Sequence, residues 1–159
     1  MIDEALFSSE STEWITPHWL FNALDKEFKF DLDPAATDET AKCDLYFTKD
    51  DDGLVQEWYV RDEVDSVFVN PPYGRAISDW VAKAYLESQR GATVVLLLPA
   101  RTDVAWFHDY ILGKAEIRFL RGRLKFLIHT QDIPFKETNP APFPSMIVVF
   151  RPSHARGVR

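Results

Sequence analysis

The chain has a single cysteine, Cys43, among its 159 residues. One thiol cannot form an internal disulfide, and no group of cysteine and histidine residues lies near it to suggest a metal site. The longest apolar run, Val94 to Leu98 with its flanks, is far shorter than the roughly 20 residues of a membrane-spanning helix. The acidic N-terminus is unlike a secretion signal. We therefore expect a cytoplasmic protein with no metal site and no membrane contact.

Glycine is also scarce, with six residues in the chain, and no repeat or low-complexity tract is visible. Hydrophobic residues make up 46% and charged residues 27%, which is typical of a globular domain with a real core. This length leaves little room for a second domain. We expect a single domain over residues 1–159, with a core of about residues 13–151 and loose ends.

The net charge of -7 argues at first against a polyanionic partner, but the charges are distributed unevenly. From Lys114 to the end there are nine basic and three acidic residues, so the first 113 residues carry -13. Arg121, Arg123 and Lys125 alternate, which would place them on one face of a strand where they can contact DNA phosphates. The alternative is a solvated surface without a nucleic-acid role.

Apolar periodicity and turn residues predict helices that alternate with strands. Thr16 and Pro17 have the pattern of a helix cap and first turn, and the helix should continue to Phe28. Further helices are predicted over residues 37–42 (a short stretch), 78–90 and 102–112. Strands are predicted over residues 28–32, 66–69, 92–98, 116–120, 124–128 and 146–150. This order predicts an α/β fold with a doubly wound sheet, closed by an antiparallel hairpin near the C-terminus.

The strongest chemical signal is Asn70-Pro71-Pro72-Tyr73, which directly follows the predicted strand at residues 66–69. Two prolines make this loop stiff, and the carboxyl ends of strands are where open α/β sheets bind ligands. The Asn70 side-chain oxygen and the neighbouring carbonyl groups can accept hydrogen bonds from an amino group, while Tyr73 can stack on a flat substrate. A purely structural turn is the alternative interpretation.

A loop of this kind after a hydrophobic strand resembles the catalytic motif of amino-group methyltransferases. The order of motifs from about Glu13 to Arg151 more closely resembles the small phage-type DNA N6-adenine methyltransferases, the phage Dam family. The other matching segments are Trp14 to Pro17, Phe30 to Ala36, Gly53-Leu54 with Trp58, Leu98 to Arg101, Trp106 to His108, Arg118 to Phe126 and Ala141 to Ser145.

The resemblance implies a Rossmann-like S-adenosylmethionine-dependent methyltransferase sheet. It also implies S-adenosylmethionine as methyl donor and N6 of a flipped adenine in double-stranded DNA as acceptor. Asn70, Pro71, Pro72 and Tyr73 would hold the adenine. The implied cofactor contacts are Thr16, Pro17, Asp33, Pro34, Ala35 and Asp52, with Asp31 as a weaker alternative. A phage-encoded enzyme would work in the cytoplasm of a bacterial host.

The chain departs from common methyltransferases in two ways. It has no glycine-rich turn after Asp33, and the stretch from Asp33 to Val67 is too short for two full strand-helix units, so we expect a sheet of reduced size. No separate target-recognition domain fits either. DNA reading must therefore come from loops or from a second subunit, as in a homodimer.

Two other functions remain open. Release-factor glutamine methyltransferases use the same loop, because a glutamine amide presents a similar nitrogen with two hydrogens. A non-catalytic acidic binding protein with a methyltransferase shape is the third interpretation, and the acidic first 113 residues permit it.

Overall fold

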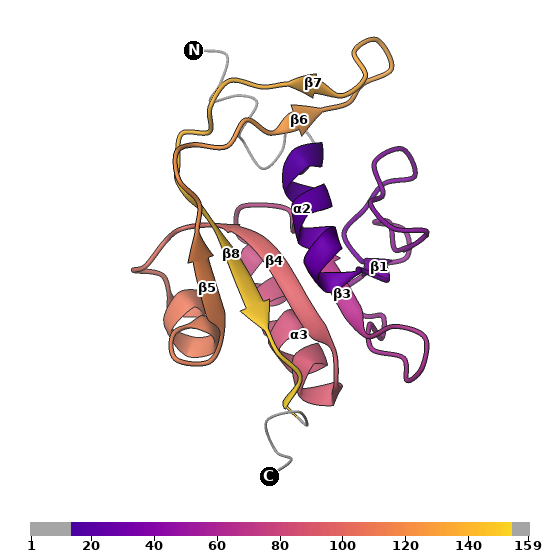
Figure 1. Cartoon of the computed structure of the whole chain (residues 1–159), viewed down its shortest axis with the longest axis vertical. Coiled ribbons are helices and arrows are strands. Elements are labelled where there is room, and N and C mark those ends of the chain that lie inside the picture. Colours follow the sequence, from indigo (N-terminus) through magenta and orange to yellow (C-terminus); the bar gives the residue numbers. More distant parts are fainter. Residues whose placement is uncertain (1–13, 154–159) are drawn as a thin grey trace.

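The computed structural model describes residues 14–153 of the chain, and a six-stranded mixed sheet forms its centre (Figure 1). Its strands, in spatial order, are β2 (Leu45–Tyr46), β1 (Leu32–Asp33), β3 (Ser66–Val69), β4 (Thr93–Pro99), β8 (Ser145–Phe150) and β5 (Glu116–Phe119). The first four run parallel, and β8 lies antiparallel between β4 and β5. A separate antiparallel hairpin joins β6 (Leu127–Ile128) to β7 (Lys136–Glu137).

Helices cover both faces of this sheet, as the continuous apolar strand at residues 92–98 predicted. On one face, Leu20, Phe21 and Leu24 of α2 (His18–Phe28) pack with Val95 and Leu97 of β4. On the other face, α3 (Ile77–Arg90) packs with the alternate residues of the same strand: its contacts include Val94, Leu96 and Leu98. The predicted α/β class is therefore confirmed as a mixed sheet with a helix on each face, because one strand supplies alternate side chains to two cores.

Six of the predicted elements lie within a residue or two of their observed bounds. They are α2, β3, α3, β4, β5 and β8. The antiparallel C-terminal end is also confirmed, through β8 and the β6–β7 hairpin. The predicted loose ends fall mostly outside the described residues. No helix within residues 14–153 is long and apolar enough to cross a membrane.

Other predicted elements are wrong in kind or extent. Residues 37–42 form turns and bends because the hydroxyl of Thr37 accepts the backbone N–H of Thr40 at 3.2 Å, which competes with helical bonding. The strand predicted at 28–32 shrinks to β1, since Lys29 adopts a left-handed conformation (φ 52°) that ends α2. The helix predicted at 102–112 is reduced to a π-helical turn, η1 (Phe107–Ile111).

The segment carrying Arg121, Arg123 and Lys125 is not a strand, which corrects the prediction. Gly122 has a φ of 76°, so the chain turns there, and regular pairing begins only at β6. Buried Leu124 and Phe126 nevertheless alternate with exposed Arg123 and Lys125. Arg123 and Lys125 therefore lie on the same exposed side. The strand pairing that was expected around them does not form in this described segment.

Candidate active site

The carboxyl ends of the parallel strands β1, β3 and β4 meet at one edge of the sheet, and the Asn70–Tyr73 loop leaves β3 at this edge. Pro71 is buried and Pro72 is exposed, so the stiff loop is anchored on one side only. Nδ2 of Asn70 donates a hydrogen bond of 2.7 Å to the carbonyl oxygen of Trp14. Because the amide nitrogen is used in this way, the side-chain oxygen of Asn70 is the atom left for an incoming donor.

Tyr73 is held within a cluster of aromatic rings. Its ring centroid lies 5.7 Å from Trp14, 6.1 Å from Phe126 and 5.7 Å from Phe143. Its hydroxyl donates to the carbonyl oxygen of Leu97 at 3.1 Å, and burial raises the pKa of this phenol. The hydroxyl is thus committed to the core as a neutral donor, and the ring is the part of Tyr73 that can meet a substrate.

A cavity of about 560 Å³ opens beside this ring, and we name it the large cavity. Trp14, Tyr73 and Phe143 give it an aromatic wall. Arg75 and Arg101, both exposed, contribute its positive charge. A pocket that combines flat apolar walls with guanidinium groups suits a planar, polar ligand attached to an anionic chain.

The segment before α2 closes a second space, the small cavity, of about 30 Å³. Ile15 pairs with Leu127 through backbone bonds of 2.8 and 2.9 Å, which fixes the segment against β6. Thr16 is 1% exposed, and its hydroxyl is buried without a hydrogen-bond partner while the residue lines the small cavity.

The predicted capping role of Thr16 is wrong, because Pro17 is the N-cap and the helix start has no side-chain capping bond. The carbonyl of Pro17 accepts the N–H groups of Leu20 and Phe21.

Asp33 lies across the small cavity from this segment and is buried. Its carboxylate accepts the backbone N–H groups of Ala35 at 3.3 Å and Lys42 at 3.0 Å. Burial raises the pKa of Asp33 to about 6, although those two bonds and the Lys42 charge act in the opposite direction. Burial also lowers the pKa of Lys42, against the effect of Asp33. The two backbone bonds and the Lys42 charge do not offset the cost of burying the ionised Asp33 carboxylate. Such a carboxylate is suited to a cationic or hydrogen-donating ligand.

A third space, the outer cavity, has a volume of about 140 Å³. Asp52 lines it from a turn with a φ of 58°, and its carboxylate accepts the Leu54 N–H at 3.2 Å. Pro34, Ala35 and Pro72 line the same cavity. Asp52 is exposed, so its carboxylate also remains open to solvent.

Glycine at position 53 is required by the way the outer cavity is built. A Cβ at Gly53 would lie 2.1 Å from the carbonyl oxygen of Pro34 and 2.9 Å from the ring of Trp80. The two loops that flank the cavity therefore touch through backbone alone. The close approach that a glycine-rich turn after the first strand would allow is supplied here by a glycine in a later loop.

The structure thus brings together Asn70, Pro72, Tyr73, Thr16, Asp33, Pro34, Ala35 and Asp52 around three cavities. Asp31 does not join them: at the opposite end of β1, its carboxylate accepts the N–H groups of Asp65 and Ser66 at 3.0 and 3.2 Å. Arg121, Arg123 and Lys125 line a different groove. Within residues 14–153 no three acidic, histidine or cysteine residues are grouped to hold a metal ion.

Sequence reasoning missed four residues that line the large cavity, Trp14, Arg75, Arg101 and Phe143. Three of them stand within the segments that carry the family resemblance, and Arg75 lies two residues after the loop. Their positions in the chain therefore pointed to the site. Their roles depend on contacts between distant segments, such as the one between Trp14 and Asn70.

Comparison with known proteins supports the arrangement of these motifs. The chain is 30% identical over 125 residues to the DNA N-6-adenine-methyltransferase of Escherichia phage T1. That match covers 78% of this chain and 49% of the relative, so the chain spans about half the length of the curated protein it matches. Residues 5–158 match the family described as DNA N-6-adenine-methyltransferase (Dam). The chain therefore belongs to the DNA N-6-adenine-methyltransferase (Dam) family.

Proposed function

We propose that this chain transfers a methyl group from S-adenosylmethionine to N6 of an adenine in DNA. One observation carries the proposal: the Asn70–Tyr73 loop contributes a residue to each of the three cavities. Asn70 lines the small cavity, Pro72 the outer cavity and Tyr73 the large cavity. A loop placed in this way can contact the methyl donor on one side and the methyl acceptor on the other.

The outer and small cavities have the chemistry that S-adenosylmethionine requires, and Ala35 lines both. The unpartnered hydroxyl of Thr16 and the buried carboxylate of Asp33 would hold the methionine end, while Asp52 would hold the adenosine. Pro17, Pro34 and Ala35 would shape the backbone around it. A Rossmann-like methyltransferase sheet of reduced size agrees with the parallel strands β1 to β4 and with the absence of an α-helix between residues 34 and 65 of the described chain.

The large cavity is the proposed site of the adenine. A base must leave the duplex to reach such a pocket, and the aromatic rings of Trp14, Tyr73 and Phe143 would replace the stacking that it loses. Trp14 lines both the large and the small cavity, so the two adjoin at this residue.

Asn70 would act on the acceptor nitrogen. Its side-chain oxygen and the adjacent backbone carbonyls would accept the two hydrogens of the amino group and hold its lone pair toward the small cavity. Bound S-adenosylmethionine supplies an electrophilic methyl group on a positively charged sulfur. As positive charge develops on the nitrogen, its hydrogen bonds to Asn70 strengthen, which lowers the barrier.

DNA phosphates would meet Arg121, Arg123 and Lys125 on one side and Arg75 and Arg101 at the large cavity. The DNA is double-stranded in this proposal, and its sequence would be read by loops or by a second copy of the chain. The phage origin of the relative agrees with work in the cytoplasm of an infected bacterium.

The decisive experiment is incubation with duplex DNA and methyl-labelled S-adenosylmethionine, followed by digestion to nucleosides. Label in N6-methyladenosine is expected. Label in N4-methylcytosine would overturn the choice of base. A chain that binds the donor, leaves DNA unlabelled and methylates a glutamine-containing peptide would support protein methylation, and failure to bind the donor would leave a non-catalytic binding protein.

A further inference from the structure

A fourth cavity, away from the three at the sheet edge, carries an unusual combination of side chains. This basic groove has a volume of about 410 Å³. Its lining is Trp19, Leu120, Arg121, Arg123, Leu124, Lys125 and Glu137. Three cations face one carboxylate, so the groove is positive although the whole chain carries -7. The charge complements a polyanion.

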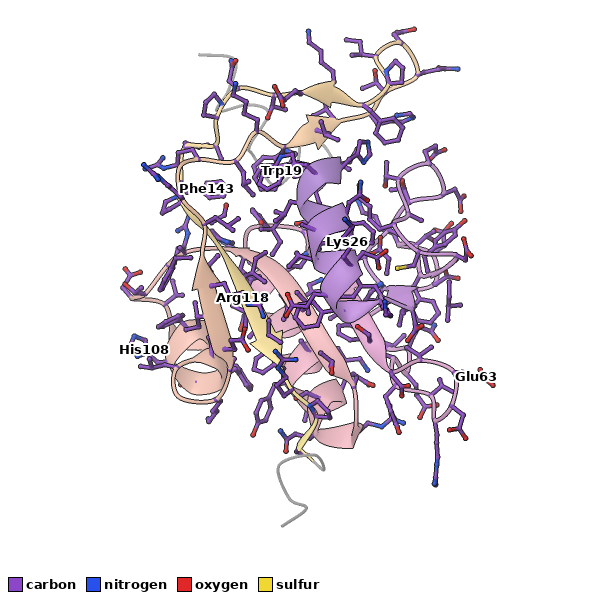
Figure 2. The ribbon with its side chains drawn as sticks, viewed as in Figure 1. Trp19, Lys26, Glu63, His108, Arg118 and Phe143 are labelled. Atoms are coloured by element: carbon purple, nitrogen blue, oxygen red, sulfur yellow. The ribbon has the colours of Figure 1, made fainter. Side chains whose placement is uncertain are left out.

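Besides its basic residues, the groove is lined by an aromatic side chain, Trp19. It lies in the first turn of α2, at the end of that helix nearest the β6–β7 hairpin (Figure 2). Its side chain is 62% exposed, whereas Trp58, Trp80 and Trp106 are buried. A large aromatic ring left in water beside cations is a typical feature of surfaces that stack a base while binding its phosphates.

The groove is built on a rigid support. Leu124 and Ala141 are joined by a backbone bond of 2.8 Å, and Thr138 bonds to Phe126 at 2.7 Å. The Arg123 guanidinium donates to the Ala141 carbonyl at 3.3 Å, which restrains its direction. These two joined segments, residues 120–126 and 137–143, form a ribbon that also places Phe126 against Tyr73 in the aromatic cluster. The ribbon lines the basic groove through Leu124 and the large cavity through Phe143.

We propose that the basic groove binds an unpaired nucleotide of DNA, whose base stacks on Trp19 while neighbouring phosphates contact Arg121, Arg123 and Lys125. A base inside a duplex has both faces covered by its neighbours, so only an unpaired base can present a face to this ring. The inference rests on the proposed function in taking DNA as the partner. It adds a second, non-catalytic base site in a cavity other than the large cavity.

The test uses a thymine-only 15-nucleotide single strand and an abasic strand of equal length. Neither contains adenine, so binding does not depend on methyl transfer. Anisotropy of the labelled strands is measured for the wild type, Trp19→Ala, Trp19→Phe and Leu86→Ala. Leu86 is a matched control because it is 58% exposed and lies on α3, on the other face of the sheet.

We expect Trp19→Ala to weaken binding of the thymine strand about 5- to 150-fold, the range for loss of one base stack. Trp19→Phe should retain most of the affinity, and Leu86→Ala all of it. The abasic strand should bind more weakly and should not distinguish Trp19→Ala from the wild type. The thymine strand should quench the tryptophan fluorescence of the wild type, and this quenching should be lost in Trp19→Phe.

Equal binding of the thymine strand by the wild type and by a folded Trp19→Ala protein would overturn the inference, as would equal binding of the thymine and abasic strands. The proposed function is judged separately, by nucleoside identification after methylation of duplex DNA. If the thymine strand binds through Trp19 but no methyl group is transferred, the proposed function is contradicted and the nucleotide site in the basic groove is supported. If methyl transfer occurs and Trp19 has no effect on binding of the thymine strand, the proposed function is supported and the nucleotide site is contradicted.

Discussion

Replacement of Asp33 by asparagine is the substitution whose consequences follow most directly from the structure. Burial holds the pKa of Asp33 at about 6, against 3.8 for the unperturbed group. Between these two values the folded protein holds a proton that the unfolded chain releases. Stability must therefore fall as pH rises through this window, by up to about 3 kcal/mol for a shift of this size. Most of that loss lies below pH 6.

Between pH 5 and pH 7 the Asp33 carboxyl should lower the free energy of unfolding by about 1 kcal/mol as the pH rises. Asparagine keeps a side-chain oxygen for one of the two backbone N–H groups but cannot titrate. We expect the wild-type stability relative to Asp33→Asn to decline by this amount across the interval, whatever constant difference the mutation introduces. Urea unfolding at both pH values, followed by tryptophan fluorescence, measures the change. Parallel pH curves for the two proteins would refute the reasoning.

The same titration should appear in donor binding. If Asp33 meets the cationic end of S-adenosylmethionine, bound donor favours the ionised carboxylate, so affinity should rise as pH passes through about 6. Asp33→Asn should bind donor about 10- to 150-fold more weakly at pH 7.5, as expected for loss of a charged hydrogen bond. Asp31→Asn is the control, because Asp31 binds the Asp65 and Ser66 N–H groups away from the cavities. Unchanged donor affinity in a folded Asp33→Asn protein would remove Asp33 from the site.

Three other substitutions test the site and its support. Asn70→Ala should lower single-turnover methylation by about 100-fold or more with donor binding intact, and Asn70→Asp should recover part of it; wild-type turnover in a folded alanine variant would contradict the mechanism. Tyr73→Phe should keep methyl transfer and lose about 1 kcal/mol of unfolding free energy, because the Leu97 carbonyl loses the hydrogen bond from the Tyr73 hydroxyl. If the methylation rate fell as far as in Asn70→Ala, the hydroxyl would have a catalytic role. Glu87→Gln should cost about 1 to 3 kcal/mol in urea unfolding, because glutamine keeps an oxygen for the Trp58 and Tyr59 N–H groups but loses the buried charge that pairs with Lys83. Glu57→Gln, in an exposed ion pair, is the control and should cost less.

The sequence predicted those parts of the fold whose signals are local and repeated. The continuous apolar run of Val94 to Leu98 and the helical spacing of Leu20 and Leu24 both depend on neighbours a few residues away, and both were interpreted correctly. The two-residue strands β2 and β7 carry no such period. Their pairing is decided by the partners that tertiary packing brings alongside, so no window of sequence could reveal them.

Thr16 shows why site roles are harder to predict than elements. Threonine followed by proline is a local helix-start signal, and the helix does start there. The Thr16 hydroxyl makes no capping bond, however, and is buried without a partner in a residue that lines the small cavity. What orients the segment is the pairing of Ile15 with Leu127, far along the chain. The same holds for Asn70, whose amide is fixed by the Trp14 carbonyl. Sequence could identify these residues, while their orientation depended on contacts with the other half of the chain.

The missing glycine-rich turn illustrates how one structural requirement can be met by another part of the chain. Close approach at the outer cavity requires a position without a Cβ, and after β1 the chain offers Pro34 and Ala35 instead. Gly53 meets the requirement from the opposite loop, where any side chain would collide with the Pro34 carbonyl. Trp58 then fixes that loop, since its indole N–H donates to the Gly53 carbonyl at 2.8 Å and its backbone N–H binds Glu87. A reduced sheet with short strands can therefore hold a defined cavity. Through Glu87 and Trp58, α3 fixes the loop that carries Gly53, a support that a longer strand-helix unit would otherwise provide.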